Sequence, residues 1–333
     1  MRCFSLSKNI PKFQTYGSLI KNLRSKNMII ENETDAINLL KENGYYTLIN
    51  RYKGDFYISN KSLFERDTSI NDLYKYKLIE TDFRNILFKY TIIFEQKLKE
   101  SISYTLSKDI GIRTSDYLNP YNYRNKNKAK QITGFINKKI IDCHDDPVKY
   151  YKNHYNDIPP WVLVNNITLG QTRMLFSMFK FDQSDYVAQQ LISPNKEIFS
   201  NNRNEREELI EFTRNIISII SDFRNTLAHG RRMVHFNSKT KLKYKSLKLF
   251  ITPNVITKNE FYTDKLCTND PFAFLVVLSI TMKSTQLDNL IIQLKEWEKT
   301  NTGTINDKKL FTKFLSNSKI PQDFIQRLNN IPK

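Results

Sequence analysis

Six consecutive residues, Arg224-Asn225-Thr226-Leu227-Ala228-His229, carry side chains that could act on a phosphodiester without a metal. His229 can move protons near neutral pH, because the ordinary pKa of an imidazole lies in that range. Arg224 can stabilise the negative charge that develops on a phosphate, and Asn225 can hydrogen-bond that phosphate or hold His229 in one tautomer. These three residues are therefore the candidate catalytic groups, and RNA cleavage is the chemistry they fit.

The helix expected to carry this motif does not place its two main side chains together. Apolar residues recur at helical spacing after Arg206, and Gly230 is a natural C-terminal stop, which predicts a helix over about 206–229. Five residues on an ideal helix rotate by about 140°, so Arg224 and His229 would not share a face. Either the helix is distorted there, or two copies of the chain combine. A plainer interpretation is that His229, with Arg231 and Arg232, only complements the helix dipole.

The charge of the chain points to an anionic partner. The 333 residues include 52 Lys and Arg against 34 Asp and Glu, a formal net charge of +18. This excess favours a polyanion, with nucleic acid as the first candidate and an anionic membrane surface as the second. A hydrophobic content of 40% and an aromatic content of 13% exclude an intrinsically disordered chain.

Several other chemistries lack their usual signatures. The sequence has no P-loop, no G-x-G-x-x-G turn and no G-x-S-x-G elbow, and its four histidines do not have the spacings of zinc ligands. We therefore expect neither a metal nor a cofactor. Three distant cysteines, Cys3, Cys143 and Cys267, predict no disulfide framework, and the longest apolar run, 272–280, is too short to span a membrane. A cytoplasmic protein without a membrane partner is the expectation.

Scarce glycine and proline with long apolar patterns predict a mainly α fold, a helical bundle with a small β-hairpin or an irregular basic insertion. The strongest pattern predicts a core helix over about 82–106, and Thr34 is the expected N-cap of a shorter helix that ends at Gly44. Further helices are expected in 161–181, interrupted at Gly170, and near 271–298 and 307–330. Alternating lysines suggest a hairpin at about 242–262. The expected divisions are 1–68, an N-terminal helical and RNA-contact region; 69–235, the helical core with the basic insertion at about 117–158; and 236–333, the hairpin and C-terminal helices.

Two basic tracts are the candidate RNA-binding surfaces. One mixes tyrosines with cations before Pro159, and the other follows His229 directly. Cations can neutralise phosphates while tyrosines stack on bases, although charge runs are also often just solvated faces. The candidate RNA-binding residues are Arg124, Lys126, Lys128, Lys130, Arg231, Arg232, Lys239, Lys241, Lys243 and Lys245.

The motif and three further blocks resemble a known family. Arg224 to His229 resembles the R-x4-6-H signature of HEPN-domain ribonucleases, and other segments look like the Abi (abortive infection) family of the AbiD/AbiF type. These segments are Asn43 to Tyr52, Asp82 to Leu87 with Glu95 following, and Ile158 to Trp161 with Leu169-Gly170. The blocks occur in the family's order. The family's second basic position in the long helix is Lys99 here rather than arginine, and Glu95 could pair with Arg224 or form an ordinary structural ion pair.

The resemblance implies a HEPN-like helical core that acts as a metal-independent endoribonuclease toxin in phage defence, related to the Cas13 effectors. It also implies a cognate small structured noncoding RNA that binds and regulates the toxin. HEPN ribonucleases build one site from two motifs, and in this sequence no other arginine is separated from a histidine by four to six residues. A homodimer is therefore expected, with Arg224 and His229 of both copies lining one cleft.

Two other function classes remain open at this level. The chain could be a non-catalytic RNA-binding or sensor protein in which the Arg-His motif is structural, and tight, salt-sensitive RNA binding without cleavage would favour that reading. A membrane-surface or DNA-binding effector is a third reading. It lacks support, because the sequence has neither a clear amphipathic membrane helix nor an evident helix-turn-helix.

Overall fold

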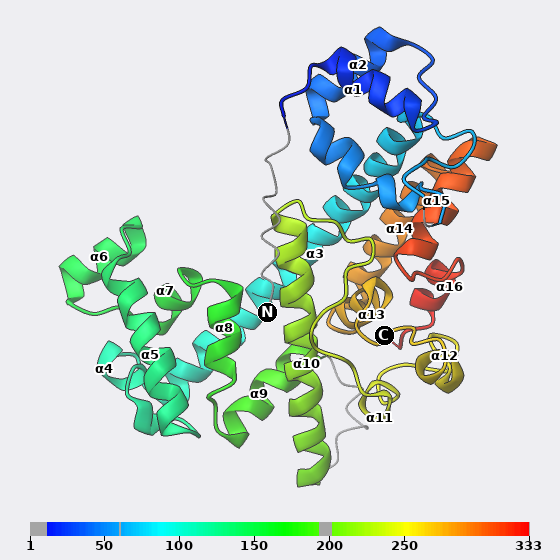
Figure 1. Cartoon of the computed structure of the whole chain (residues 1–333). Helices are drawn as coiled ribbons and strands as arrows, with labels where there is room; N and C mark the ends of the chain where they lie inside the picture. Colours follow the sequence, from blue (N-terminus) through cyan, green and yellow to red (C-terminus); the bar gives the residue numbers. More distant parts are fainter. Residues whose placement is uncertain (1–11, 60, 193–201, 333) are drawn as a thin grey trace, which may run out of the picture.

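The computed structural model describes residues 12–59, 61–192 and 202–332, and in these ranges the protein is almost entirely helical (Figure 1). Two isolated β-bridges, Ile29 with Ser69 and Tyr57 with Phe64, are the extended pairings found there. The predicted mainly α fold is therefore confirmed. Cys143 and Cys267 are free thiols, whereas Cys3 lies outside the described residues.

The N-terminal part is built from short helices that precede the long core helix. They are α1 (Tyr16–Ser25), α2 (Glu33–Asn43), the π-helical turn η1 (Tyr46–Asn50) and the 3-10 turn η2 (Lys53–Asp55). The predicted end of α2 at Gly44 is confirmed, and Gly44 takes a positive φ of 73°. The predicted N-cap at Thr34 is wrong, because the side chain of Asn32 accepts the amides of Thr34 and Asp35. Asparagine and threonine are both favourable N-cap residues, so residue type alone does not show which of the two positions caps the helix.

The central helix of the fold is α3 (Ile70–Asp109), 40 residues long and without a single glycine or proline. It begins earlier than predicted because Ser69 and Asp72 form a capping box. At about 1.5 Å per residue it is roughly 60 Å long. The predicted core residues Phe83, Leu87 and Leu98 are fully buried along it. Because α3 runs through the whole molecule in Figure 1, it can position side chains in several regions at once.

A separate lobe projects to the left in Figure 1 and contains the Tyr/Lys-rich tract. Its elements are α4 (Thr114–Tyr117), η3 (Pro120–Asn122), α5 (Lys126–Ile141), α6 (Asp146–Tyr155), α7 (Pro160–Asn165) and α8 (Leu169–Phe176). The expectation of an irregular insertion is wrong, since the buried face of α5 forms an apolar stripe that includes Ala129, Ile132 and Ile136. The predicted interruption at Gly170 is also misplaced: the chain breaks before Thr168, which caps α8, and Gly170 lies inside that helix.

The motif helix is α10 (Arg203–Ala228), which follows α9 (Phe181–Leu191) and stands at the centre of Figure 1. Its buried face packs on α3 and α13, where Phe223 stacks on Phe274 with ring centroids 4.5 Å apart. The helix ends as predicted at Gly230, whose φ is +62°. The amide of Arg231 bonds to the Thr226 carbonyl and that of Gly230 to the Leu227 carbonyl, which is a Schellman motif.

The C-terminal part consists of six helices on the right of Figure 1. They are α11 (Tyr244–Leu247), α12 (Lys258–Tyr262), α13 (Pro271–Ile280), α14 (Ser284–Thr300), α15 (Ile305–Asn317) and α16 (Phe324–Asn329). α14 packs against α3 through Trp297, whose ring stacks on Phe83 at 4.7 Å and whose indole N–H donates to the Ile79 carbonyl at 3.1 Å. None of the helices in the described ranges has the length and apolarity needed to cross a membrane.

Three predictions for this part are wrong. The hairpin at 242–262 does not form: the amides of Ser238 and Leu242 bond to the carbonyls of Asn269 and Thr268, so the extended lysine run pairs with a loop. The single helices predicted at 271–298 and 307–330 are each two helices. The first pair is divided at 281–283, where neither glycine nor proline marks the break, and the second is divided near Lys319, which has a positive φ of 51°.

Candidate active site

Arg224 is held from the side of α3. Its Nε and Nη2 atoms each lie 3.1 Å from Oε2 of Glu95, and Lys99 contacts the other carboxylate oxygen, Oε1, at 3.1 Å. The Glu95 side chain is 9% exposed and the Arg224 side chain 26%. A carboxylate this well buried needs cationic partners, and two of them fix it from both sides. Glu95 therefore holds Arg224 in one orientation, and Lys99 belongs to the same cluster.

His229 is the C-cap residue of α10 and its side chain is exposed. Its backbone amide bonds to the carbonyls of Asn225 and Leu227, whereas its imidazole forms no hydrogen bond or ion pair with any residue in the described ranges. Asn225 lies one turn earlier, is also exposed, and shares a face with His229. The structure thus brings Asn225 and His229 together at the surface end of α10.

α10 continues without distortion up to Ala228. The sequence left two ways to bring Arg224 and His229 together, a distorted helix or a combination of two copies. The distorted helix is therefore wrong. Arg224 is turned toward Glu95 on α3, and Asn225 and His229 lie on another face of the same helix. A site that uses both Arg224 and His229 on one phosphate needs a second motif or a shift of a side chain.

Three cations that the motif does not include gather at the same helix end. Arg84 donates to the Leu227 carbonyl at 3.1 Å, and Arg51 donates to the Gly230 carbonyl at 2.6 Å. Burial, and then the charges of Arg51 and Arg84, lower the pKa of the nearby Lys77. Arg51 and Arg84 satisfy carbonyls that the helix end leaves free, whereas Lys77 donates to the side-chain oxygen of Asn43. The two arginines concentrate positive charge at the helix end that displays His229.

Sequence reasoning missed Arg51, Arg84 and Lys77 as site residues. Arg51 and Arg84 stand inside two of the blocks that carry the family resemblance, which was the available signal. Nothing in their local spacing indicates that they meet at the end of a helix more than 140 residues later.

The chain after His229 is fixed by a buried glutamate of α3. Oε1 of Glu80 accepts the amides of Met233 at 2.5 Å and Val234 at 3.1 Å, and Oε2 accepts the Tyr52 hydroxyl at 2.6 Å. Glu80 is completely buried. Burial and the Glu80 carboxylate raise the pKa of Tyr52, which keeps its hydroxyl protonated as a donor.

The basic segment after the motif divides into structural and exposed cations. Arg232 forms an ion pair with Asp55, donates to the Arg51 carbonyl and lies 4.9 Å over the Tyr52 ring, so it is largely engaged within the fold. His235 lies 2.9 Å from the other Asp55 oxygen. The remaining predicted RNA-binding residues of this segment are exposed: Arg231, Lys239, Lys241, Lys243 and Lys245, the last two beside glutamates of α10.

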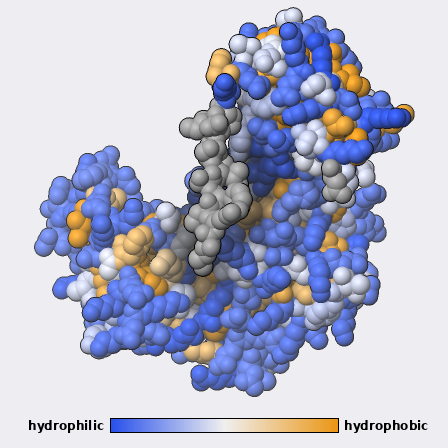
Figure 2. Space-filling model, viewed as in Figure 1, coloured by the Kyte–Doolittle hydropathy of each residue, from blue (hydrophilic) through white to orange (hydrophobic). Residues whose placement is uncertain are grey.

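The predicted RNA-binding residues of the projecting lobe, Arg124, Lys126, Lys128 and Lys130, are all exposed. Lys126 lies 3.9 Å from the centroid of the exposed Tyr121 ring, whereas Tyr117 and Tyr123 are buried core residues. Only some of the tyrosines of this tract can therefore stack on bases. Figure 2 shows a mostly hydrophilic surface that is hollowed between this lobe and the N-terminal helices, and the C-terminal end of α10 lies between the same two parts in Figure 1.

No group of three or more His, Cys, Asp or Glu side chains in the described part of the chain is placed to hold a metal ion. The chemical groups at the end of α10 are instead an exposed imidazole, an exposed amide and several guanidinium groups. Such a set can bind a phosphate and move a proton near it.

The family model for Abi-like proteins matches residues 38–235. This span covers more than half of the chain and contains Arg51, Arg84, Glu95, Arg224 and His229. The protein therefore belongs to the Abi-like family, and membership suggests a role in abortive infection, a form of phage defence. No curated protein and no solved structure matches the chain.

Proposed function

We propose that the protein is a metal-independent endoribonuclease of the HEPN type, with His229, Arg224 and Asn225 as its catalytic residues. The observation that carries the proposal is the contrast within one motif. Arg224 is fixed by the buried Glu95, whereas His229, five residues on, is exposed and has no side-chain partner among the described residues. A catalytic histidine needs to reach its substrate, and an exposed imidazole without a side-chain partner is free to do so.

In this proposal each group has a separate task. His229 takes the proton from the attacking 2'-hydroxyl or gives one to the leaving 5'-oxygen. Arg224 stabilises the charge that develops on the phosphate, and Asn225 hydrogen-bonds the phosphate or orients His229. Arg51 and Arg84 are additional candidates for holding the phosphate, because each has donors beyond the one bound to a carbonyl.

The active form is proposed to be a homodimer. One motif per chain and an undistorted α10 leave Arg224 and His229 of one copy on different faces. Two copies that meet at the exposed ends of α10 would place the arginine of one beside the histidine of the other. The RNA partners are then a substrate and a cognate small structured noncoding RNA that restrains the toxin in the cytoplasm, in keeping with the +18 charge.

The ends of the cleaved RNA test the reaction. Attack by the 2'-hydroxyl is expected to leave a 2',3'-cyclic phosphate on one product and a 5'-hydroxyl on the other, and the rate should be unchanged by a chelator. Mass spectrometry of an oligonucleotide cut with and without EDTA gives both results. A 5'-phosphate, or activity lost with EDTA and restored by a divalent metal, would reject the mechanism.

Glu95→Gln is expected to slow cleavage by about tenfold or more, because a neutral amide cannot hold both Arg224 and Lys99. Loss of the carboxylate should also lower the free energy of unfolding by about 1 to 3 kcal/mol. Single-turnover cleavage rates and urea denaturation measure the two effects. Glu95 acts through Arg224, so we expect the chemical step to slow while RNA affinity remains nearly unchanged.

The matched control is Glu100→Gln, the same change at an exposed position of α3. It should keep both the rate and the stability of the parent protein. Equal rates for the two variants would mean that the Glu95–Arg224 pair only supports the fold.

A further inference from the structure

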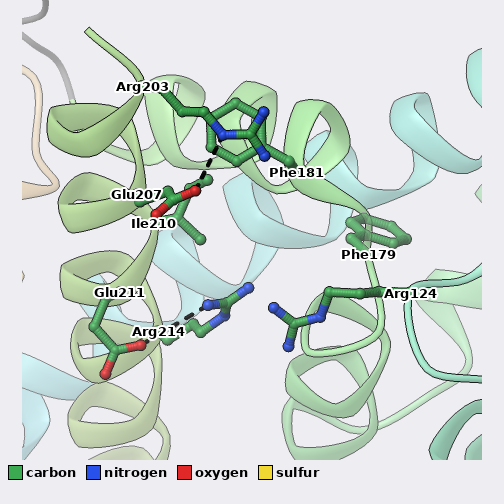
Figure 3. Close-up of a pocket in the computed structure, with 8 residues that line it drawn as sticks. All are labelled: Arg124, Phe179, Phe181, Arg203, Glu207, Ile210, Glu211 and Arg214. Carbon is green, nitrogen blue, oxygen red and sulfur yellow. Dashed lines mark hydrogen bonds and ion pairs between the residues drawn. The ribbon is translucent and has the colours of Figure 1, made fainter.

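A second cationic site lies beside the N-terminal half of α10, away from His229 (Figure 3). A cavity of about 430 Å³ opens there between α9, α10 and Arg124, the second residue after η3. Its walls are formed by Arg124, Phe179, Phe181, Arg203, Glu207, Ile210, Glu211 and Arg214. Arginines thus enter the cavity from two elements that are distant in sequence.

The guanidinium groups of Arg124 and Arg214 point toward each other across this cavity (Figure 3). Burial, and then the charge of Arg124, lower the pKa of Arg214. Its Nε is buried without a hydrogen-bond partner among the described residues. Its Nη1 forms a long ion pair with Glu211, 3.8 Å from the carboxylate oxygen Oε2. Arg124 forms no ion pair within the described ranges. Two guanidinium groups that face each other beside a single carboxylate provide a favourable site for an anion between them.

The third arginine of the cavity, Arg203, already has partners within the fold. Arg203 forms an ion pair with Glu207 at 3.2 Å and stacks on Phe181, 4.8 Å from the ring centroid. These contacts make one wall firm without neutralising Arg124 or Arg214. The positive charge of the cavity that is available to a ligand is therefore that of Arg124 and Arg214.

The site continues toward the candidate active site. Arg214 also lines a neighbouring cavity of about 410 Å³, together with Lys128, Arg173 and Ser218. Ser218, Asp222, Asn225 and His229 follow Arg214 at intervals of three and four residues, so they lie on one face of α10. From Arg214 to His229 this face extends over about 22 Å, at 1.5 Å per residue.

We propose that Arg124 and Arg214 together hold a phosphate group of a single RNA strand that lies along this face of α10 toward His229. Two planar guanidinium groups can hydrogen-bond the oxygens of one phosphate from opposite sides. Lys128 and Arg173 of the neighbouring cavity can contact the strand as it continues along α10. A free nucleotide would not need these additional cations. The inference rests on the proposed function in taking RNA as the ligand, but it concerns binding rather than cleavage.

All variants in this test also carry His229→Ala, so that RNA is bound without being cut, and each is compared with the His229→Ala protein. Arg214→Gln and Arg124→Gln are each expected to weaken binding of a 12-nucleotide single-stranded RNA by about threefold to tenfold, measured by fluorescence anisotropy. The double variant should also reduce the slope of log K against log salt by about 0.7, the value for one lost phosphate contact on a single strand. Because both residues hold the same phosphate, the double variant should lose less than the product of the two single effects.

Two further measurements separate a ligand site from a structural one. Lys309→Gln removes an exposed cation of α15, outside the predicted RNA-binding residues, and should retain the affinity and salt slope of the His229→Ala protein. Arg214→Gln should leave the free energy of unfolding equal or higher, since it removes a half-buried cation that faces another.

Affinity and slope for Arg214→Gln equal to those of Lys309→Gln would overturn the inference, as would the absence of any binding of single-stranded RNA. If uridine monophosphate at equal concentration protected against heat through the same two arginines while RNA binding did not need them, the site would belong to a free nucleotide. Because binding is measured without cleavage, a failure of the proposed ribonuclease activity would be seen separately in the product assay.

Discussion

His229→Ala is expected to abolish RNA cleavage and growth inhibition while leaving the fold, RNA binding and dimerisation intact. Removing a general acid or base costs about 10²- to 10⁴-fold in rate, which is enough to bring cleavage near background. The fold should tolerate the change because the imidazole is exposed and has no side-chain bond with the described residues, and because Gly230 and the backbone form the helix end. Induced growth curves and cleavage assays on purified protein measure the two activities.

The control for this prediction is His144→Ala, which removes another exposed histidine. It should behave as the parent protein in growth and in cleavage. Cleavage that persists in the His229 variant at the level of this control would remove His229 from the active site. Both variants should elute as the parent does in size-exclusion chromatography.

Glu80→Ala is expected to lower the free energy of unfolding by about 3 to 5 kcal/mol. The change leaves two buried backbone amides, of Met233 and Val234, and the Tyr52 hydroxyl without their acceptor, and each unsatisfied buried group costs about 1 to 3 kcal/mol. Urea denaturation followed by circular dichroism measures the loss. A smaller loss is expected for Glu80→Gln, which keeps one acceptor oxygen.

Glu100→Ala provides the reference, because it removes an exposed glutamate from the same helix. We expect it to change stability by no more than about 0.5 kcal/mol. A Glu80→Ala variant as stable as this reference would show that the Glu80 contacts contribute little to the fold.

The sequence predicts helices well where periodicity and end signals agree. α3 and α10 have apolar residues at helical spacing, and Gly230 ends α10 where its freedom to adopt a positive φ is needed. The prediction of a hairpin at 242–262 is wrong because the alternation of lysines with apolar residues indicates only that Leu242 is buried and that the lysines beside it are exposed. A strand also needs a partner strand, and here the backbone bonds to a loop at Thr268.

The candidate site is predictable from sequence only in part. Arg224, Asn225 and His229 form a local motif, and pairing with Arg224 was one of the two roles open to Glu95. Arg51 and Arg84 contact the end of α10, and Glu80 contacts the chain that follows it. All three are more than 140 residues away in the sequence, so no local pattern reveals them. The facing pair of Arg124 and Arg214 depends in the same way on how the projecting lobe docks against α10.

The contacts of η1 and η2 with the end of α10 affect how the protein can be shortened. Arg51 and Asp55 both contact the Gly230–His235 stretch, so η1 and η2 help to build the same end of the helix that displays His229. A truncated protein that begins at α3 would lose these contacts and expose the apolar surface that the N-terminal helices cover. Fusion partners or labels are therefore better attached before α1 than substituted for the N-terminal helices.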